Sequence, residues 1–297
     1  MSFEEINHEQ LQKIISRLDQ AIYNHNQWFN ALIRTLICKL PPDQHDLNPE
    51  AHKECRFGQW CCSSEVEKDL VGHPGFKSLQ EAHRRMHQLA KTLLETINTG
   101  IVISPPDYDL FSNALDGLRL EISTLKRELE VFLYNRDPLT GAINRVNMLT
   151  LLREQQEASK REYQSCCIVM VDLDHFKNVN DLHGHPVGDA LLAGISHYLI
   201  KHIRPYDKLF RYGGEEFLIC LVNVESNAAF ELTENLRKGL SETDVVENPK
   251  LRITASFGLT LLDPYSPVEQ SIERSDKALA AAKSAGRNCV KLWTPEM

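Results

Sequence analysis

Apolar residues recur every three or four positions through the first half of the chain and form strand-like runs in the second half. Three stretches of the first half, Asn7–Leu40, Phe76–Asn98 and Asp107–Asn135, keep the spacing of an amphipathic helix over their whole length. Pairs of prolines follow the first stretch and precede the third, and prolines break helices. The first half is therefore predicted to be an all-α bundle.

Histidines stand on the apolar stripes of the first two predicted helices. His25 takes the position between Ile22 and Phe29 where a core residue is expected, and His83 and His87 lie one turn apart on the second helix. All three imidazoles are expected to face the bundle interior. A lone inward histidine is usually a hydrogen-bonded core residue, whereas three of them near a cysteine favour a metal site.

The third predicted helix carries a coiled-coil seam. Its apolar residues alternate steps of four and three: Phe111, Leu115, Leu118, Ile122, Leu125, Leu129 and Phe132. Packing within its own bundle and packing on a second copy are equally good explanations for the first half of this seam. Beyond Leu125 no other helix of the first half is available in sequence, which favours self-association there.

After Asp137 the pattern changes to alternating strands and helices. Helices are expected over 145–158, 188–204, 227–240 and 268–284, and strands over 165–171, 207–210, 217–222, 251–262 and 288–292. The order β-α-β-β-α-β predicts a ferredoxin-like, palm-type sheet, so the whole chain is α+β. We expect a helical domain over residues 1–128, ending in the coiled-coil-like helix, and a second domain over residues 129–297.

Charge and cysteine usage exclude several classes of protein. With 33 basic and 41 acidic residues the formal net charge is -8, which argues against a broad surface for nucleic acid polymers or anionic membranes. The first ten residues are polar and acidic, and no apolar run approaches the roughly 20 residues of a membrane span. Eight cysteines without a regular framework fit reduced thiols. We expect a cytoplasmic protein.

Cys55 lies between His25 and His83 in the sequence, within the segment Asp43–Gly75 that is predicted to be loop-rich, and Cys55–Trp60 is turn-like. Together with His25, His83 and His87, Cys55 would complete a closed tetrahedral donor set suited to zinc. Cys61 and Cys62 remain alternatives to Cys55.

The histidine and cysteine elements resemble the chemoreceptor zinc-binding domain, a helical sensor, in order and spacing. The elements are His25, Cys55 to Trp60, and His83 with His87, and the resemblance covers about Ile6–Leu129. It implies one regulatory zinc ion in each N-terminal domain and a dimeric bundle.

The segment Arg211–Phe217 is predicted to form the acidic tip of a β-hairpin. Its two glycines allow close backbone approach, and Glu215 and Glu216 supply the hard oxygen ligands that a divalent cation prefers. Taken alone, the segment is equally well explained as a polar turn. A ferredoxin-like sheet would bring Asp172, at the end of the first strand, beside this tip. The three carboxylates together predict a metal site.

Five separated motifs resemble, in the same order, the GGDEF-type diguanylate cyclase family over about Asp137–Trp293. The motifs are Asp137–Gly141, Asp172–Asp189, Arg211–Phe217, Asp276–Leu279 with Lys283, and Gly286–Asn288. The resemblance implies an enzyme that joins two GTP molecules into cyclic di-GMP, a signalling nucleotide, and releases two pyrophosphates. It also implies two Mg²⁺ ions in each active site.

Residue roles follow from the resemblance. Asp172, the carbonyl of Leu173, Glu215 and Glu216 match the Mg²⁺ positions, while Glu215 and Lys177 match the catalytic positions. Asn180, His185, Asp189, Lys283 and Arg287 match positions that bind the substrate, the last two at its terminal phosphates. Taken one at a time, these residues read as surface side chains or helix caps. As a set in family order they favour the functional interpretation.

Arg204 and Asp207 match the product-inhibition motif of the family, which implies feedback by cyclic di-GMP. Two positions depart from the family pattern: Ala280 replaces a frequent aromatic residue, and Cys289 replaces a frequent basic residue. Neither position touches metal or nucleotide in the family, so activity is expected to survive.

One active domain binds one GTP, so the reaction requires a homodimer with two-fold symmetry. Zinc in the helical domain is expected to regulate how often the two half-sites meet. Three other functions compete with this interpretation: a catalytically silent cyclic di-GMP receptor, a cyclase that makes a monomeric cyclic nucleotide, and a zinc-binding dimeric scaffold.

Overall fold

A computed structural model describes residues 6, 8–63, 70, 72–162, 165–247 and 250–297. The chain divides into two compact units, Met1–Tyr134 and Asn135–Met297. Each unit has its own apolar core. The two units are therefore described separately.

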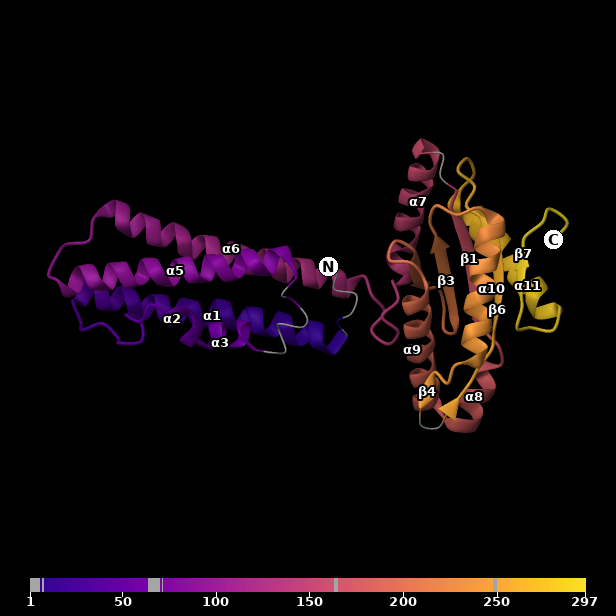
Figure 1. The fold of residues 1–297 in the computed structure, drawn as a ribbon, viewed down its shortest axis with the longest axis horizontal. Helices are drawn as coiled ribbons and strands as arrows, with labels where there is room; N and C mark the ends of the chain where they lie inside the picture. Colours follow the sequence, from indigo (N-terminus) through magenta and orange to yellow (C-terminus); the bar gives the residue numbers. More distant parts are fainter. Residues whose placement is uncertain (1–5, 7, 64–69, 71, 163–164, 248–249) are drawn as a thin grey trace. The chain divides into compact units, whose positions relative to one another are not determined.

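Three long helices build the first unit: α1 (His8–Cys38), α5 (Pro74–Asn98) and α6 (Pro105–Tyr134). They lie side by side in Figure 1, and the apolar stripe of each faces the common core. The three predicted helices are present to within a few residues. Asn7, the expected first residue of the first helix, lies outside the described residues.

Two short helices, α2 (Ala51–Glu54) and α3 (Arg56–Cys61), lie in the segment predicted to be loop-rich. The turn-like interpretation of Cys55–Trp60 is therefore wrong. Cys55 is the N-cap of α3, and its sulfur accepts a hydrogen bond from the Gly58 N–H at 3.2 Å. The rest of the loop-rich segment includes residues 64–69 and 71, which lie outside the described residues.

The seam of α6 packs inside its own bundle. Leu125 and Leu129 are 1% and 0% exposed within the single chain and belong to the same core as Leu11 and Phe76. Self-association through this seam beyond Leu125 is thus contradicted. Sequence order suggested that no helix was available there, but the helices fold back on one another and cover it.

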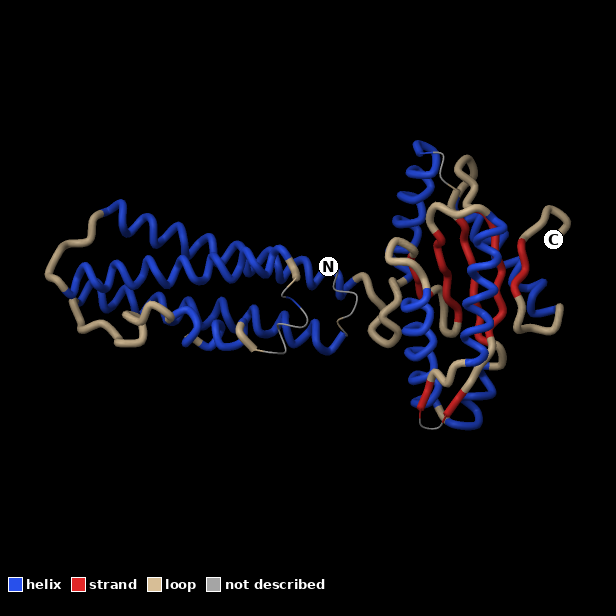
Figure 2. The backbone as a smooth tube through the Cα atoms, viewed as in Figure 1, coloured by secondary structure: helices blue, strands red, loops and turns tan. Residues whose placement is uncertain are grey.

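The second unit contains a five-stranded sheet with the order β2-β3-β1-β6-β7 (Figure 2). The strands are β1 (Cys167–Leu173), β2 (Lys208–Arg211), β3 (Glu216–Leu221), β6 (Ala255–Leu261) and β7 (Val290–Leu292). Strand β1 pairs antiparallel with β3 and β6, and β7 pairs parallel with β6. This is the order of a ferredoxin-like sheet with one added edge strand.

Helices cover both faces of this sheet (Figure 1). They are α7 (Arg145–Glu162), α8 (Phe176–His183), α9 (His185–His202), α10 (Ser226–Glu242) and α11 (Val268–Ser284). Alternate residues of β1 enter different cores: Val169 packs with α9 and α10, whereas Met170 packs with α7 and α11. The sheet is buried on both faces, which explains the continuous apolar run of β1.

Two details of the second unit differ from the predicted elements. Helix α8 was not predicted, because its eight residues are mostly polar. The strand expected over 251–262 is divided into β5 (Lys250–Leu251), which pairs with β4 (Val246–Glu247), and β6. Arg252 lies at this break, and its guanidinium pairs with Asp244 at 2.7 Å.

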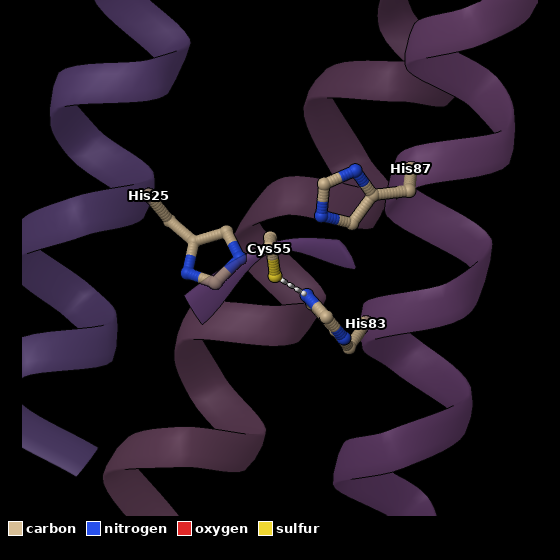
Figure 3. A group of neighbouring side chains, drawn as sticks. All are labelled: His25, Cys55, His83 and His87. Atoms are coloured by element: carbon tan, nitrogen blue, oxygen red, sulfur yellow. Dashed lines mark hydrogen bonds between the residues drawn. The ribbon is translucent and has the colours of Figure 1, made fainter. Parts of the chain in front are cut away.

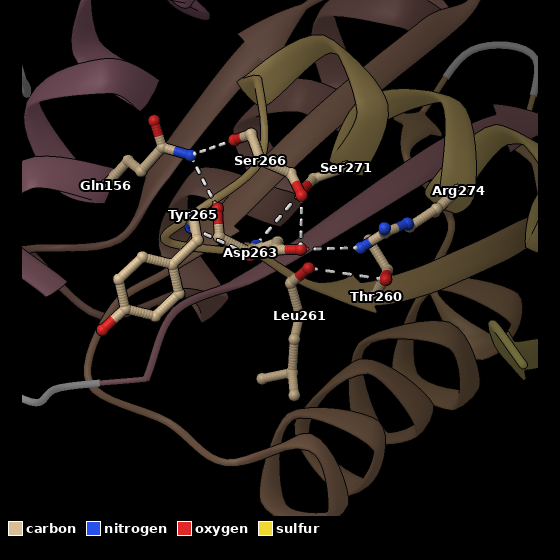
Figure 4. Close-up of polar contacts among 8 residues, drawn as sticks. All are labelled: Gln156, Thr260, Leu261, Asp263, Tyr265, Ser266, Ser271 and Arg274. Carbon is tan, nitrogen blue, oxygen red and sulfur yellow. Dashed lines mark hydrogen bonds and ion pairs between the residues drawn. The ribbon is translucent and has the colours of Figure 1, made fainter. Parts of the chain in front are cut away.

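Hydrogen bonds close the end of the sheet where β1 begins. Gln156 of α7 donates to the carbonyl oxygens of Asp263 and Ser266 at 2.6 and 2.7 Å (Figure 4). Asp263 in turn accepts from the Ser266 hydroxyl and from Arg274. The opposite end, where β1 stops, carries the acidic motifs. Among the described residues, no helix has the length and apolar content that a bilayer crossing requires.

Candidate metal centre and active site

The first unit brings four potential zinc ligands together in its core (Figure 3). They come from three elements: His25 from α1, Cys55 from the start of α3, and His83 and His87 from α5. Their donor atoms all lie within 4.8 Å of one another. Among the described residues, this is the one group of three or more histidine, cysteine and acidic side chains whose donor atoms already lie this close together.

Hydrogen bonds and ring contacts orient the four side chains. His25 Nδ1 lies 2.7 Å from the carbonyl oxygen of Ala21, so Nδ1 donates and the Nε2 lone pair is free for a metal. Cys55 Sγ lies 3.3 Å from His83 Nε2. Trp28 packs its ring 5.0 Å from the ring of His87, and its indole N–H donates to Asp46 at 2.8 Å.

Burial keeps the three imidazoles in the neutral form that a metal requires. It lowers the pKa of His83 to about 2 and that of His87 to about 3, with a further contribution from neighbouring histidines. The pKa of His25 is lowered by burial as well. Neutral imidazoles keep a lone pair for coordination. Burial raises the pKa of the Cys55 thiol, and coordination to a cation would deprotonate it.

The donor set fits zinc. His87 Nε2 is buried without a hydrogen-bond partner, and a bound cation would satisfy it. A tetrahedral zinc ion with bonds of about 2.0–2.3 Å holds its ligand atoms roughly 3.3–3.7 Å apart, so only small side-chain rotations are needed. Cys61 and Cys62 are not in the group, since Cys61 packs in the apolar core and Cys62 is exposed.

The second unit brings its acidic residues together at the end of β1. Asp172 and Glu216 are cross-strand partners on β1 and β3, and Leu173 is the last residue of β1. Glu215 lies at the hairpin tip directly before β3. The expected pairing of the first-strand aspartate with the tip is therefore present in the strand register.

Lys283 of α11 reaches this acidic group, and its Nζ lies 2.9 Å from Asp172 Oδ2. The Lys283 ammonium thus occupies one side of the Asp172 carboxylate. The carboxylate oxygens of this acidic group are the hard ligands that Mg²⁺ prefers. Burial and the nearby Asp172 carboxylate raise the pKa of Glu215, while Lys283 opposes this shift. A carboxylate with a raised pKa is a better proton acceptor.

Arg211 holds the hairpin tip, a role that the sequence analysis did not assign. Its guanidinium donates to the carbonyl oxygens of Gly213 and Gly214 and pairs with Asp137 at 2.8 Å. Asp137 also accepts from the backbone N–H and the hydroxyl of Thr140. The entry motif and the tip are thereby joined. The position of Arg211 two residues before Gly213 was the available signal.

The expected substrate residues lie on the helices that follow β1 and on the end of α11. Lys177 and Asn180 are on α8, and His185 and Asp189 are on α9. The Asn180 side chain packs where a Cβ on residue 188 would stand, so Gly188 lets the two helices meet. Arg287 lies in the turn between α11 and β7 and is exposed.

Arg204 and Asp207 lie at the other end of β2 from the hairpin tip. They line a pocket together with Tyr198, His202 and Asn235. The Asp207 carboxylate accepts from the backbone N–H groups of Arg204 and Val222 at 3.1 and 2.9 Å. Arg204 and Asp207 are therefore separated from the acidic group along β2. The hydrogen bonds that Asp207 accepts also hold the backbone of this loop.

Fold and site define an α+β protein with a buried histidine and cysteine cluster in its helical unit and a separate acidic group at the end of the sheet in its second unit. Residues 134–289 match the family described as diguanylate cyclase, GGDEF domain, and residues 25–94 match the chemoreceptor zinc-binding domain. The chain belongs to the diguanylate cyclase GGDEF domain family and carries a chemoreceptor zinc-binding domain before the GGDEF domain.

Relatives extend this similarity to almost the whole chain. Diguanylate cyclase DgcZ of Escherichia coli K12 is 26% identical over 289 residues, which are 94% of this chain and 93% of DgcZ. The coiled coil and GGDEF domain of DgcB from Caulobacter crescentus, in complex with c-di-GMP, superposes with a TM-score of 0.55 at 26% identity, covering 61% of this chain and 98% of that one.

A third similar protein is the diguanylate cyclase SiaD from Pseudomonas aeruginosa, solved in complex with its activator SiaC. It is 30% identical to this chain with a TM-score of 0.53, and the match covers 79% of this chain and 95% of SiaD. The similarity therefore extends beyond the GGDEF domain.

Proposed function

We propose that this diguanylate cyclase acts as a homodimer that condenses two GTP molecules into cyclic di-GMP under the control of zinc and of its own product. The observation that carries the catalytic part is the register of β1 and β3, which pairs Asp172 with Glu216 and brings Glu215 to the same edge. A silent receptor would not need this set of carboxylates. Since GTP is a cytoplasmic nucleotide, we also propose that the enzyme acts in the cytoplasm.

Asp172, the Leu173 carbonyl, Glu215 and Glu216 would hold two Mg²⁺ ions. When bound, these ions lower the pKa of the attacking 3′-hydroxyl and neutralise charge on the phosphoryl group. Glu215 accepts the proton of that hydroxyl, which is an ordinary role for a positioned carboxylate. Lys177 stabilises the negative charge that develops in the transition state.

The remaining residues bind the nucleotide. Lys283 and Arg287 hold the terminal phosphates, and release of pyrophosphate breaks the bond between the α- and β-phosphoryl groups. Lys283 would leave Asp172 for the phosphates once a metal ion neutralises the carboxylate. Asn180 and Asp189 accept hydrogen bonds from guanine, His185 contacts the same substrate, and an adenine would leave these acceptors unpaired.

The outer face of α6 supports the homodimer. Opposite the buried seam, Leu110, Leu120, Val131 and Tyr134 are 48%, 66%, 52% and 72% exposed. They fall on one heptad pattern with Gly117, where a Cβ would meet no atom within 4 Å. A second copy of the same helix fits this face, because its small residue allows close approach. The buried seam and the exposed stripe are thus distinct faces of one helix.

Zinc control is supported by the closed donor set. With three histidines and one cysteine the ion has no open position, which suits a regulatory rather than a catalytic metal. The ligands join α1, α3 and α5, and α6 packs on the same core. Losing the ion would change the packing beneath α6 and alter how often two GGDEF domains meet.

Product feedback is supported by the pocket beside Arg204. Cyclic di-GMP offers two phosphates and two guanine bases, and an arginine pairs with either. The GGDEF domain of DgcB from Caulobacter crescentus, 28% identical to this chain, was solved in complex with c-di-GMP. Arg204 and Asp207 are the residues through which we propose that the product binds here.

Incubation of the full chain with GTP and Mg²⁺, with and without a zinc-selective chelator, tests the proposal. Mass analysis should find cyclic di-GMP and pyrophosphate, at a rate that changes when zinc is removed. A monomeric cyclic nucleotide as the main product would refute the reaction. An unchanged rate after verified removal of zinc would refute the regulation while leaving the reaction intact.

A further inference from the structure

Asp174 is a buried carboxylate, two residues beyond Asp172, whose role the proposed mechanism leaves open. Its side chain is 4% exposed. Oδ1 accepts from the Ser256 hydroxyl at 2.7 Å, and Oδ2 accepts from the Thr254 hydroxyl at 2.7 Å and the Asn288 backbone N–H at 3.0 Å. A carboxylate buried this far needs such donors. The last of them belongs to the turn that carries Arg287.

That turn has an unusual backbone. Gly286, Arg287 and Asn288 have φ angles of 109°, 66° and 45°, so three successive residues lie in the left-handed region. Residues other than glycine adopt this region sparingly, and a succession of them persists only where the surroundings hold it. The turn therefore needs external support.

The structure supplies that support at Asn288. Its backbone N–H donates to Asp174, and its side-chain oxygen accepts from Arg237 at 2.7 Å. On the other side, the Arg287 N–H donates to the carbonyl oxygen of Ala282 at 3.1 Å. Asp174 is thus the link between the end of β1, where Asp172 lies, and the turn that presents Arg287.

We propose that Asp174 is a positioning residue whose buried carboxylate holds the left-handed turn and so aims Arg287 at the terminal phosphates of GTP. This inference rests on the proposed role of Arg287 in substrate binding. Asp174 does not touch the nucleotide in this arrangement. Removing the Asp174 carboxylate should therefore weaken binding of the β- and γ-phosphates and leave the contacts to guanine and the α-phosphate unchanged.

The Asp174→Asn variant tests this selectively. It is nearly isosteric, and its amide nitrogen can donate to the Ser256 hydroxyl. Its neutral amide oxygen is a weaker acceptor than a carboxylate, so the hydrogen bond from the Asn288 N–H weakens. Affinity for a GTP analogue with a methylene bridge between its α- and β-phosphorus atoms, which cannot release pyrophosphate, should fall roughly tenfold. Affinity for GMP, which lacks the terminal phosphates, should stay within about twofold.

A double-mutant cycle shows whether Asp174 acts through Arg287. In an Arg287→Ala background, Asp174→Asn should cause little further loss of analogue affinity. Ser256→Ala, which removes a donor on the other carboxylate oxygen, is the matched control and should leave analogue affinity unchanged. Equal losses for GMP and the analogue, or full additivity with Arg287→Ala, would overturn the proposal.

A second variant approaches the turn from its other side. Gly286→Ala meets no atom within 4 Å but strains a φ of 109°, so it disturbs the turn without touching Asp174. Gly286→Ala should lose affinity for the GTP analogue but not for GMP. This variant replaces Asp174→Asn as the test if Asp174→Asn does not fold. These are binding measurements, so a wild-type chain that binds the analogue but forms no cyclic di-GMP would refute the proposed reaction and still leave this inference to be judged.

Discussion

The two candidate sites of this chain differ in the type of their ligands and in the burial of those ligands. In the first unit, neutral imidazoles and a thiol converge in an apolar core, and the three histidines are 2–5% exposed. In the second unit, carboxylates line one end of a sheet, and the Lys283 ammonium pairs with one of them, Asp172. The histidines of the first site are buried away from water, whereas Glu215 of the second site is partly accessible.

This contrast explains what each site is suited to do. A buried, closed donor set binds one ion firmly and makes the fold depend on it. An acidic edge with exposed neighbours binds cations loosely enough for a nucleotide to arrive with them and for products to leave. The proposed zinc site and the proposed catalytic site thus differ in burial as well as in their place in the sequence.

The largest expected effect lies at the open site. Glu215→Gln removes the proposed proton acceptor and one cation ligand, so cyclic di-GMP formation should fall roughly a thousandfold or more. Mass analysis of the products measures this. The zinc content and the thermal unfolding temperature should stay as in the wild type. If Glu215→Gln kept a tenth of the wild-type activity, the catalytic site would lie elsewhere.

The closed site should respond first in its affinity for zinc. His83→Ala removes a ligand, and its loss of zinc affinity should exceed the roughly 10- to 100-fold effect typical of outer-shell changes. Competition with a chromogenic chelator measures it. His45→Ala is the matched control in the same unit, because the His45 side chain is 84% exposed and outside the donor group. Equal affinities for the two variants would exclude the proposed ligand set.

The two faces of α6 should separate stability from assembly. Leu129→Ala opens a cavity in the bundle and should lower the free energy of unfolding by about 2–5 kcal/mol. Leu120→Ala on the exposed stripe should change it by less than about 0.5 kcal/mol at dilutions where the chain is monomeric, and should weaken the dimer. Chemical denaturation and analytical ultracentrifugation measure the two quantities. An unchanged dimer with Leu120→Ala would place the interface elsewhere.

The smallest expected effect is at the feedback pocket. Arg204→Ala should weaken product inhibition roughly tenfold, the loss expected for one charge-assisted contact, and so raise the steady-state yield of cyclic di-GMP. Progress curves with added product measure it. Lys201→Ala, a nearby exposed basic residue that does not line the pocket, should behave as the wild type. Product inhibition that is unaltered in Arg204→Ala would exclude this pocket.

Much of the fold was predictable because its signals are local. The three-and-four spacing placed the long helices, and the same spacing turned His25, His83 and His87 inward. The continuous apolar run of β1 and the glycines before Glu215 marked a strand end and a hairpin tip. Helix period and turn chemistry are properties of neighbouring residues, so they can be read along the chain.

Long-range contacts account for what the sequence could not reveal. Leu125 and Leu129 are covered by helices of their own bundle. The spacing of apolar residues in a seam does not reveal which helices pack against it. Likewise, Arg211 meets Asp137 across 74 positions, and Asp174 meets Asn288 across 114. The residue types that can bind zinc or magnesium are local information, whereas the convergence of their donor atoms depends on how distant elements pack.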